Sequence, residues 1–161
     1  MEFRLRKDAR EWFRGIRGQM DLDFDPYYLC LMAGLAARRK TTEREINVTE
    51  DTAELVDSFP RLYQEQGKLI IALFLATELE LAEIDTKERA AVHRLVEHYV
   101  SNETPSRLTD EGMKELNRYS YGGFEAISEW FSERPRSLET FLPAYRQRLN
   151  EEILKREAER G

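Results

Sequence analysis

The two histidines are the first residues to test for chemistry, because histidine is a common metal ligand and general base. His93 and His98 are five residues apart, which separates them by about 140° around a helix and prevents them from sharing a metal ion. The stretch between them misses the two H-E-x-x-H-type zinc motifs by one residue, and it lacks the Glu-x-x-His spacing of di-iron bundles. We therefore expect ordinary helix-surface histidines and no metal site.

Three aspartates alternate at Asp21, Asp23 and Asp25, a pattern that suggests a calcium-binding loop. The glycine and the later glutamate of an EF-hand loop are missing, so a polar loop that ends in a helix cap explains them better. Gly67-Lys68 lacks the upstream glycine of a phosphate-binding loop, and no Gly-x-Ser-x-Gly motif is present. The sequence therefore predicts no enzyme and no cofactor, and favours a protein that acts by binding.

Basic residues are concentrated at the N-terminus of an otherwise acidic chain. The net charge is −6, yet residues 1–44 carry ten Lys or Arg against seven Asp or Glu, whereas residues 45–161 carry 15 against 24. Because the whole chain is acidic, a site for a polyanion is expected only in residues 1–44. The alternative is a solvated helix face with favourable cations at a helix C-terminus. The candidate DNA contacts are Arg4, Arg6, Lys7, Arg10, Arg14, Arg17, Arg38, Arg39 and Lys40.

The single cysteine, Cys30, lies in an apolar run and excludes an internal disulfide. A core thiol is the favoured interpretation, and a lone thiol fits a reducing compartment. Residues 1–17 carry charges throughout and do not resemble a signal peptide. The longest apolar run, residues 69–76, is too short to cross a bilayer. These features predict a cytoplasmic protein that does not enter a membrane.

The segments that must position the basic residues are mostly helical. Residues 3–7 alternate apolar and basic side chains, which predicts a short strand or an extended arm. One helix is expected over residues 9–18, and a second over residues 26–40 after an Asp-Pro start. The second helix is apolar on more than one face, which predicts self-association. The residues that cover more than one face are Tyr28, Leu31, Met32 and Leu35.

Capping residues predict further helices along the chain. A long helix is expected over residues 60–82, and others begin at capping residues. The caps are Thr49, Asp85, Thr109 and Ser137. With few glycines and prolines for turns, the chain predicts an all-α, compact multi-helix fold with a short N-terminal strand or arm. We expect a single domain, 1–161, with residues 1–44 as a basic module and residues 45–161 as the acidic remainder.

Two adjacent glycines, Gly122 and Gly123, lie inside the helix that follows Thr109. Each costs about 1 kcal/mol relative to alanine in a helix, so an interruption of the helix is expected there. Close packing of another helix on the glycines is one alternative. Another is a ligand or partner surface lined by Tyr119, Tyr121 and Phe124.

The first forty residues resemble the N-terminal half of DndE, the small helical protein of DNA phosphorothioation (Dnd) systems. The resemblance is carried by Phe3-Arg-Leu-Arg-Lys-Asp-Ala, a short amphipathic helix, Asp25-Pro26 and the apolar run from Tyr28 to Ala37. This order of arm, helix, break and apolar helix is also similar to the start of a ribbon-helix-helix DNA binder. The chain departs from the family pattern in its greater length and its strongly acidic second half.

The resemblance implies binding to double-stranded DNA, intact or nicked, and assembly into a homo-oligomer. It also implies other subunits of an anti-phage defence system as partners. We therefore expect a DNA-binding accessory subunit of a phosphorothioation-type modification or restriction system, which contacts phosphates through its N-terminal basic residues. The alternative is a protein–protein adapter in a defence complex that makes no contact with DNA.

Overall fold

The computed structural model describes residues 1–41 and 44–160, and it is 67% helical. The predicted all-α class with a short N-terminal strand is confirmed. The chain forms two compact units, each made of two stretches of sequence. The first unit contains residues 1–3 and 56–117, and the second contains residues 4–55 and 118–161. None of the described helices is both long and apolar enough to cross a bilayer.

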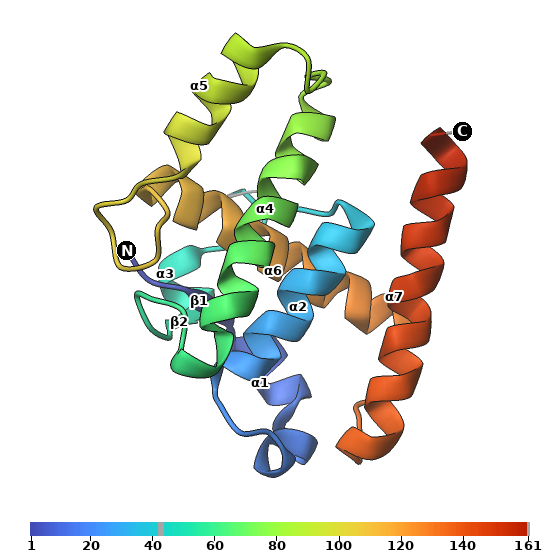
Figure 1. Cartoon of the computed structure of the whole chain (residues 1–161). Coiled ribbons are helices and arrows are strands. Elements are labelled where there is room, and N and C mark those ends of the chain that lie inside the picture. The colour runs from blue at the N-terminus through green and yellow to red at the C-terminus, as the bar shows by residue number, and fades with distance from the viewer. Residues whose placement is uncertain (42–43, 161) are drawn as a thin grey trace. The chain divides into compact units, whose positions relative to one another are not determined.

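A two-stranded antiparallel ribbon opens the second unit. Strand β1 (Arg4–Arg6) pairs with β2 (Thr52–Glu54) (Figure 1). Strand β2 follows α3 (Val48–Asp51), a single helical turn that the side chain of Asn47 caps. The short helix predicted to begin at the cap Thr49 is wrong in its start and in its extent, because Asn47 is the cap and the residues after this one turn are extended to complete the ribbon.

The segment after β1 is helical but irregular. Helix α1 (Lys7–Trp12) is followed by a 3₁₀ helix, η1 (Arg14–Gln19), instead of the single helix predicted over residues 9–18. Trp12 and the residues at positions 13 and 16 are buried, as the apolar spacing predicts. The irregular segment therefore presents its apolar side to the core and its basic side to solvent.

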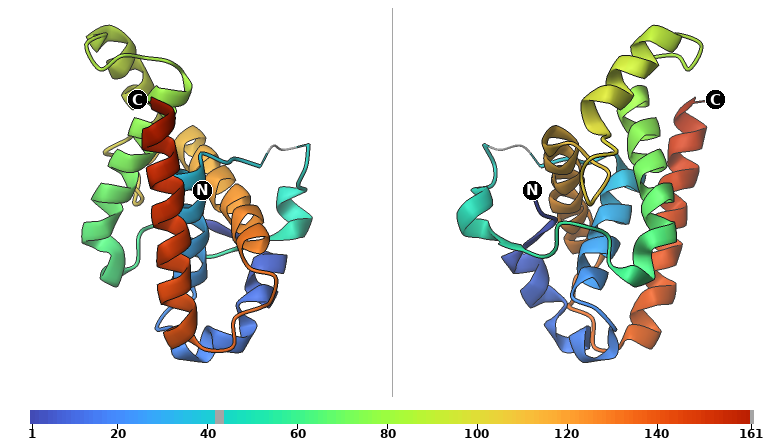
Figure 2. Two further views of the ribbon diagram at one scale, coloured as in Figure 1. Left: turned by 90° about the vertical axis from the view of Figure 1, so that its right-hand side faces the viewer. Right: turned by 60° about the vertical axis from the view of Figure 1, so that its left-hand side comes forward.

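Three long helices form the body of the second unit. They are α2 (Phe24–Ala37), the C-terminal part of α6 (Asp110–Trp130) and α7 (Leu138–Arg160). Helix α2 lies beside α7 in the views of Figure 2. The Tyr145 hydroxyl of α7 donates a buried hydrogen bond to the carbonyl oxygen of Leu29 at 2.7 Å. This bond satisfies the hydroxyl inside the apolar contact between the two helices.

Glycines bring α2 and α6 into backbone contact. A Cβ atom on Gly34 would overlap the carbonyl oxygen of Tyr119, and one on Gly123 would overlap the carbonyl oxygen of Cys30. Helix α6 is continuous through both of its glycines, so the predicted interruption is wrong. The alternative explanation, close packing of another helix, is confirmed. Dense packing between helices recovers the cost of about 1 kcal/mol that each glycine carries in a helix.

The aromatic residues around these glycines belong to the core. Tyr119, Tyr121 and Phe124 are at most 7% exposed, so they do not line a partner surface. The Cys30 thiol is also fully buried, which raises its pKa, and the predicted core thiol is confirmed. In α2, positions 31 and 35 are buried as well, so part of the apolar surface predicted for self-association is used inside the fold.

The first unit is built on a pair of helices, α4 (Gln64–Leu81) and α5 (Arg89–Tyr99) (Figure 1). A 3₁₀ turn, η2 (Arg61–Tyr63), precedes α4, so the predicted long helix is confirmed apart from its first turn. Phe74 of α4 packs against Tyr99 of α5, with ring centroids 5.1 Å apart. This contact joins the two helices at the buried side of α4.

Candidate nucleic-acid interface

Three of the predicted DNA contacts lie on the solvent-exposed side of α1 and η1. Lys7, Arg10 and Arg14 follow one another at intervals of three and four residues, which places them on one side of a helical segment. All three are exposed, and the Arg14 side chain retains 78% of its accessible surface. Lys7 and Arg10 form no ion pair with any residue that the structure describes. Arg14 lies 3.3 Å from Glu11, an exposed contact that competes weakly with a phosphate.

Two further arginines, which the sequence did not indicate, lie near this segment. The loop between α6 and α7 carries Arg134 and Arg136 on either side of a proline, and both side chains are exposed. Figure 2 shows this loop running beside η1 in both views. We call Lys7, Arg10, Arg14, Arg134 and Arg136 the basic surface.

Two close contacts hold this loop against η1. A Cβ atom on Gly15 would stand 3.1 Å from the carbonyl oxygen of Pro135, so the two backbones are in near contact. The Gln19 side chain accepts a hydrogen bond from the Leu138 N–H at 2.8 Å, immediately after the loop. Glu11 lies 3.8 Å from Arg134 as well as beside Arg14, and it therefore links the two halves of the basic surface.

Arg6 and Arg39 belong to an internal ion-pair network. Arg6 lies 3.1 Å from Glu125 and 2.8 Å from Asp8, and Arg39 lies 3.3 Å from Glu125 and 2.8 Å from Glu129. Burial alone lowers the pKa of Arg6, but the hydrogen bond to Asp8 and the two carboxylate charges raise it by more. Both guanidinium groups are therefore charged and already neutralised by neighbouring acids.

Arg4 and Arg17 are also paired. Arg4 donates to Glu54 at 3.0 Å and to the Thr52 hydroxyl at 2.7 Å, which ties β1 to β2. Arg17 donates to Asp23 at 2.9 Å. Asp23 is one of the three alternating aspartates, and its carboxylate is paired with the Arg17 guanidinium. These two arginines stabilise the ribbon and the loop before α2, and a phosphate would have to displace their acids.

Arg38 and Lys40 lie at the C-terminal end of α2. Arg38 has a left-handed backbone (φ 52°) and lines a cavity of about 240 Å³ together with Lys155 and Glu159 of α7. The Lys40 ammonium lies over the Tyr119 ring, 5.3 Å from its centre. Both cations are engaged with the helices that flank α2, and neither belongs to the basic surface.

No metal chemistry is indicated by the described residues. Among them, no three His, Cys, Asp or Glu side chains are grouped so that they could hold a metal ion. His93 lies 2.9 Å from Glu97, one turn along α5, and both side chains are exposed. Asp25 accepts a hydrogen bond from the Leu22 N–H, so it orders the loop that leads into α2.

The comparisons with known proteins provide no template for the basic surface. A scan of protein-family models finds no match to this chain, and searches of curated proteins and of solved structures find none.

Proposed function

We propose that this protein binds the phosphate backbone of duplex DNA, intact or nicked, through the basic surface. One observation carries the proposal. Five exposed cations lie on α1, on η1 and on the loop beside η1, and among the described residues Glu11 is the only carboxylate that forms ion pairs with them. Contacts of this kind give affinity and orientation without reading base sequence. Paired arginines such as Arg6 and Arg39 are structural in this proposal.

The biological setting that we propose is a phosphorothioation-type DNA modification or restriction system, in which the protein is a cytoplasmic accessory subunit. Support comes from the resemblance of its N-terminal segment to DndE. The net charge of −6 repels DNA at long range, so binding depends on the local field of the basic surface. This local origin predicts a steep dependence on salt.

Charge reversal tests the proposal directly. In Arg10→Glu/Arg14→Glu, affinity for a fluorescent duplex should be lost at moderate salt. Losing two phosphate contacts alone makes the negative slope of log affinity against log salt shallower by about 1.8. The helical circular dichroism signal should stay unchanged, because both side chains are exposed.

The matched control is Arg146→Glu/Lys155→Glu, which makes the same charge change on exposed positions of α7. This control should retain nearly all of the wild-type affinity. If the wild-type protein shifts neither intact nor nicked duplex even at low salt, the DNA proposal is wrong.

A protein–protein adapter is the second candidate, and one observation favours it. Helix α4 buries Ile70 and Phe74 but leaves Leu69 and Leu73 67% and 45% exposed. Leu62, in the preceding turn, is 64% exposed. Exposed leucines at helical spacing suit a surface that another protein, or a second copy of this one, covers. Sedimentation of wild type and Leu69→Lys/Leu73→Lys tests self-association. This leucine face is supported as an interface only if the variant sediments as a smaller assembly than the wild-type protein.

A further inference from the structure

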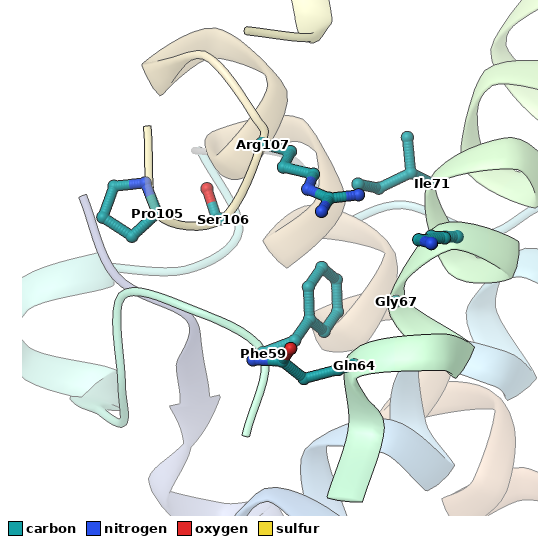
Figure 3. Close-up of a pocket in the computed structure, with 8 residues that line it drawn as sticks. Phe59, Gln64, Gly67, Ile71, Pro105, Ser106 and Arg107 are labelled. Atoms are coloured by element: carbon teal, nitrogen blue, oxygen red, sulfur yellow. The ribbon is translucent and has the colours of Figure 1, made fainter. Parts of the chain in front are cut away.

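A small pocket in the first unit is lined by hydrogen-bond donors and contains no acid. It lies between the start of α4 and the loop that precedes α6, and its volume is about 90 Å³ (Figure 3). No Asp or Glu is among its eight described lining residues. They are Phe59, Gln64, Gly67, Lys68, Ile71, Pro105, Ser106 and Arg107. The volume equals roughly three waters at ~30 Å³ each, which suits one compact polyatomic group.

Two cations and a hydroxyl line the pocket, and none of its described lining side chains is acidic. Arg107 extends over the Phe59 ring towards Ile71 in Figure 3, and Lys68 lines the same space from α4. Neither cation forms an ion pair with a described residue. The Ser106 hydroxyl accepts the Leu108 N–H at 3.2 Å, so its own proton remains available to a ligand.

The backbone on both sides of the pocket is specialised. Arg107 adopts a left-handed conformation (φ 64°), which costs a side-chain-bearing residue about 1–2 kcal/mol relative to its usual conformation. On the other side, a Cβ atom on Gly67 would stand 2.8 Å from the Phe59 ring. Glycine at this position therefore lets the ring form the apolar floor of the pocket. Strain that is kept in a folded protein is often associated with a binding site.

We propose that this pocket binds a phosphoryl group, either as inorganic phosphate or as the end of a phosphomonoester. A dianion balances the two positive charges of Lys68 and Arg107, whereas a monocarboxylate leaves one unmatched. The phosphoryl oxygens can accept from the guanidinium, the ammonium and the Ser106 hydroxyl together. This inference does not depend on DNA binding, because none of its residues belongs to the basic surface.

Calorimetry with inorganic phosphate, at constant ionic strength maintained with chloride, tests the proposal. Saturable binding in the low-millimolar range or tighter is expected, and acetate should bind far more weakly. Phenyl phosphate distinguishes the two sources, because tighter binding of the ester shows that the pocket favours a phosphomonoester. Binding of free phosphate that is equal or tighter assigns the site to the ion itself.

Two variants separate the pocket from general charge. Lys68→Gln and Arg107→Gln should each weaken phosphate binding by about tenfold, whereas Arg94→Gln, an exposed cation on α5, should not. Arg107→Gly should lose binding but melt no lower than wild type, because glycine prefers the left-handed conformation. The proposal is overturned if phosphate gives no saturable heat, or if the pocket variants bind as well as wild type.

Discussion

Gly123 of α6 lies directly against the carbonyl oxygen of Cys30 in α2, with no space for a side chain between them. The contact is reciprocal, because Gly34 of α2 lies against the carbonyl oxygen of Tyr119 in α6. Neither neighbour is the flexible end of a side chain, so neither can move aside without moving a helix. The separation of α2 and α6 is therefore set by two glycines.

Replacing Gly123 with alanine should destabilise the fold strongly. A methyl group forces the two helices apart, and overpacking of this kind costs about 3 kcal/mol or more when backbone must shift. Chemical denaturation gives the change in the free energy of unfolding. Gly18→Ala is the control, since nothing lies within 4 Å of a Cβ atom there and stability should stay equal or rise slightly. Equal changes in the free energy of unfolding for Gly123→Ala and Gly18→Ala would refute the close contact of Gly123 with α2.

Neutralising Arg134 and Arg136 should weaken DNA binding although both lie more than a hundred residues from α1 in sequence. Each phosphate contact removed makes the negative slope of log affinity against log salt shallower by about 0.9. A salt series on Arg134→Gln/Arg136→Gln measures this change. Arg94→Gln, outside the basic surface, should leave both affinity and slope unaltered. A normal slope in the double variant would confine binding to α1 and η1.

The Cys30 thiol should resist alkylation in the native protein. Burial raises its pKa, and the thiolate is the reactive form, so almost none is present at neutral pH. Mass spectrometry after iodoacetamide treatment should show no adduct at pH 8, and a full adduct once the protein is unfolded. Rapid modification without unfolding would contradict the buried position.

Acid should weaken the network around Arg39. The hydrogen bond and charge of Arg39 lower the pKa of Glu129 in the folded state. Its contribution to stability is therefore complete above the unfolded pKa of about 4.3, and it is lost as the pH falls through the lower folded pKa. Denaturation between pH 6 and pH 3 should show a larger loss for wild type than for Glu129→Gln. Parallel pH curves would show that this ion pair contributes nothing.

Local signals predicted the beginnings of α6 and α7 correctly but missed those of α3 and α5. Asn47, and not Thr49, caps α3, and α5 begins at Arg89 and not directly after Asp85. Thr109 accepts a hydrogen bond from the Gly112 N–H at 3.0 Å, and Ser137 accepts one from the Thr140 N–H at 3.2 Å, as caps should. The same local reasoning failed at Gly122 and its neighbour, because helix propensity takes no account of a second helix. Strand β2 was missed because three residues carry no detectable alternation.

The candidate site was only partly accessible to sequence reasoning, for the same physical reason. Counting charges within residues 1–44 identified Lys7, Arg10 and Arg14, which remain exposed. The count could not show that Arg6 is neutralised by an acid far along the chain. The count also could not include Arg134, because only the fold places the loop between α6 and α7 beside η1.

The distant pairing of Arg6 and Arg39 sets an order of events during translation. Glu125 follows Arg6 by 119 residues, and Glu129 follows Arg39 by 90. At about 5–20 residues per second, the ribosome takes roughly 5–25 s to supply these acids. Throughout that time Arg39 lacks both of its acids and Arg6 has only Asp8, and the glycine face of α2 has no partner helix. Completion of α6 therefore supplies the missing carboxylates together with the helix that packs on the glycine face of α2.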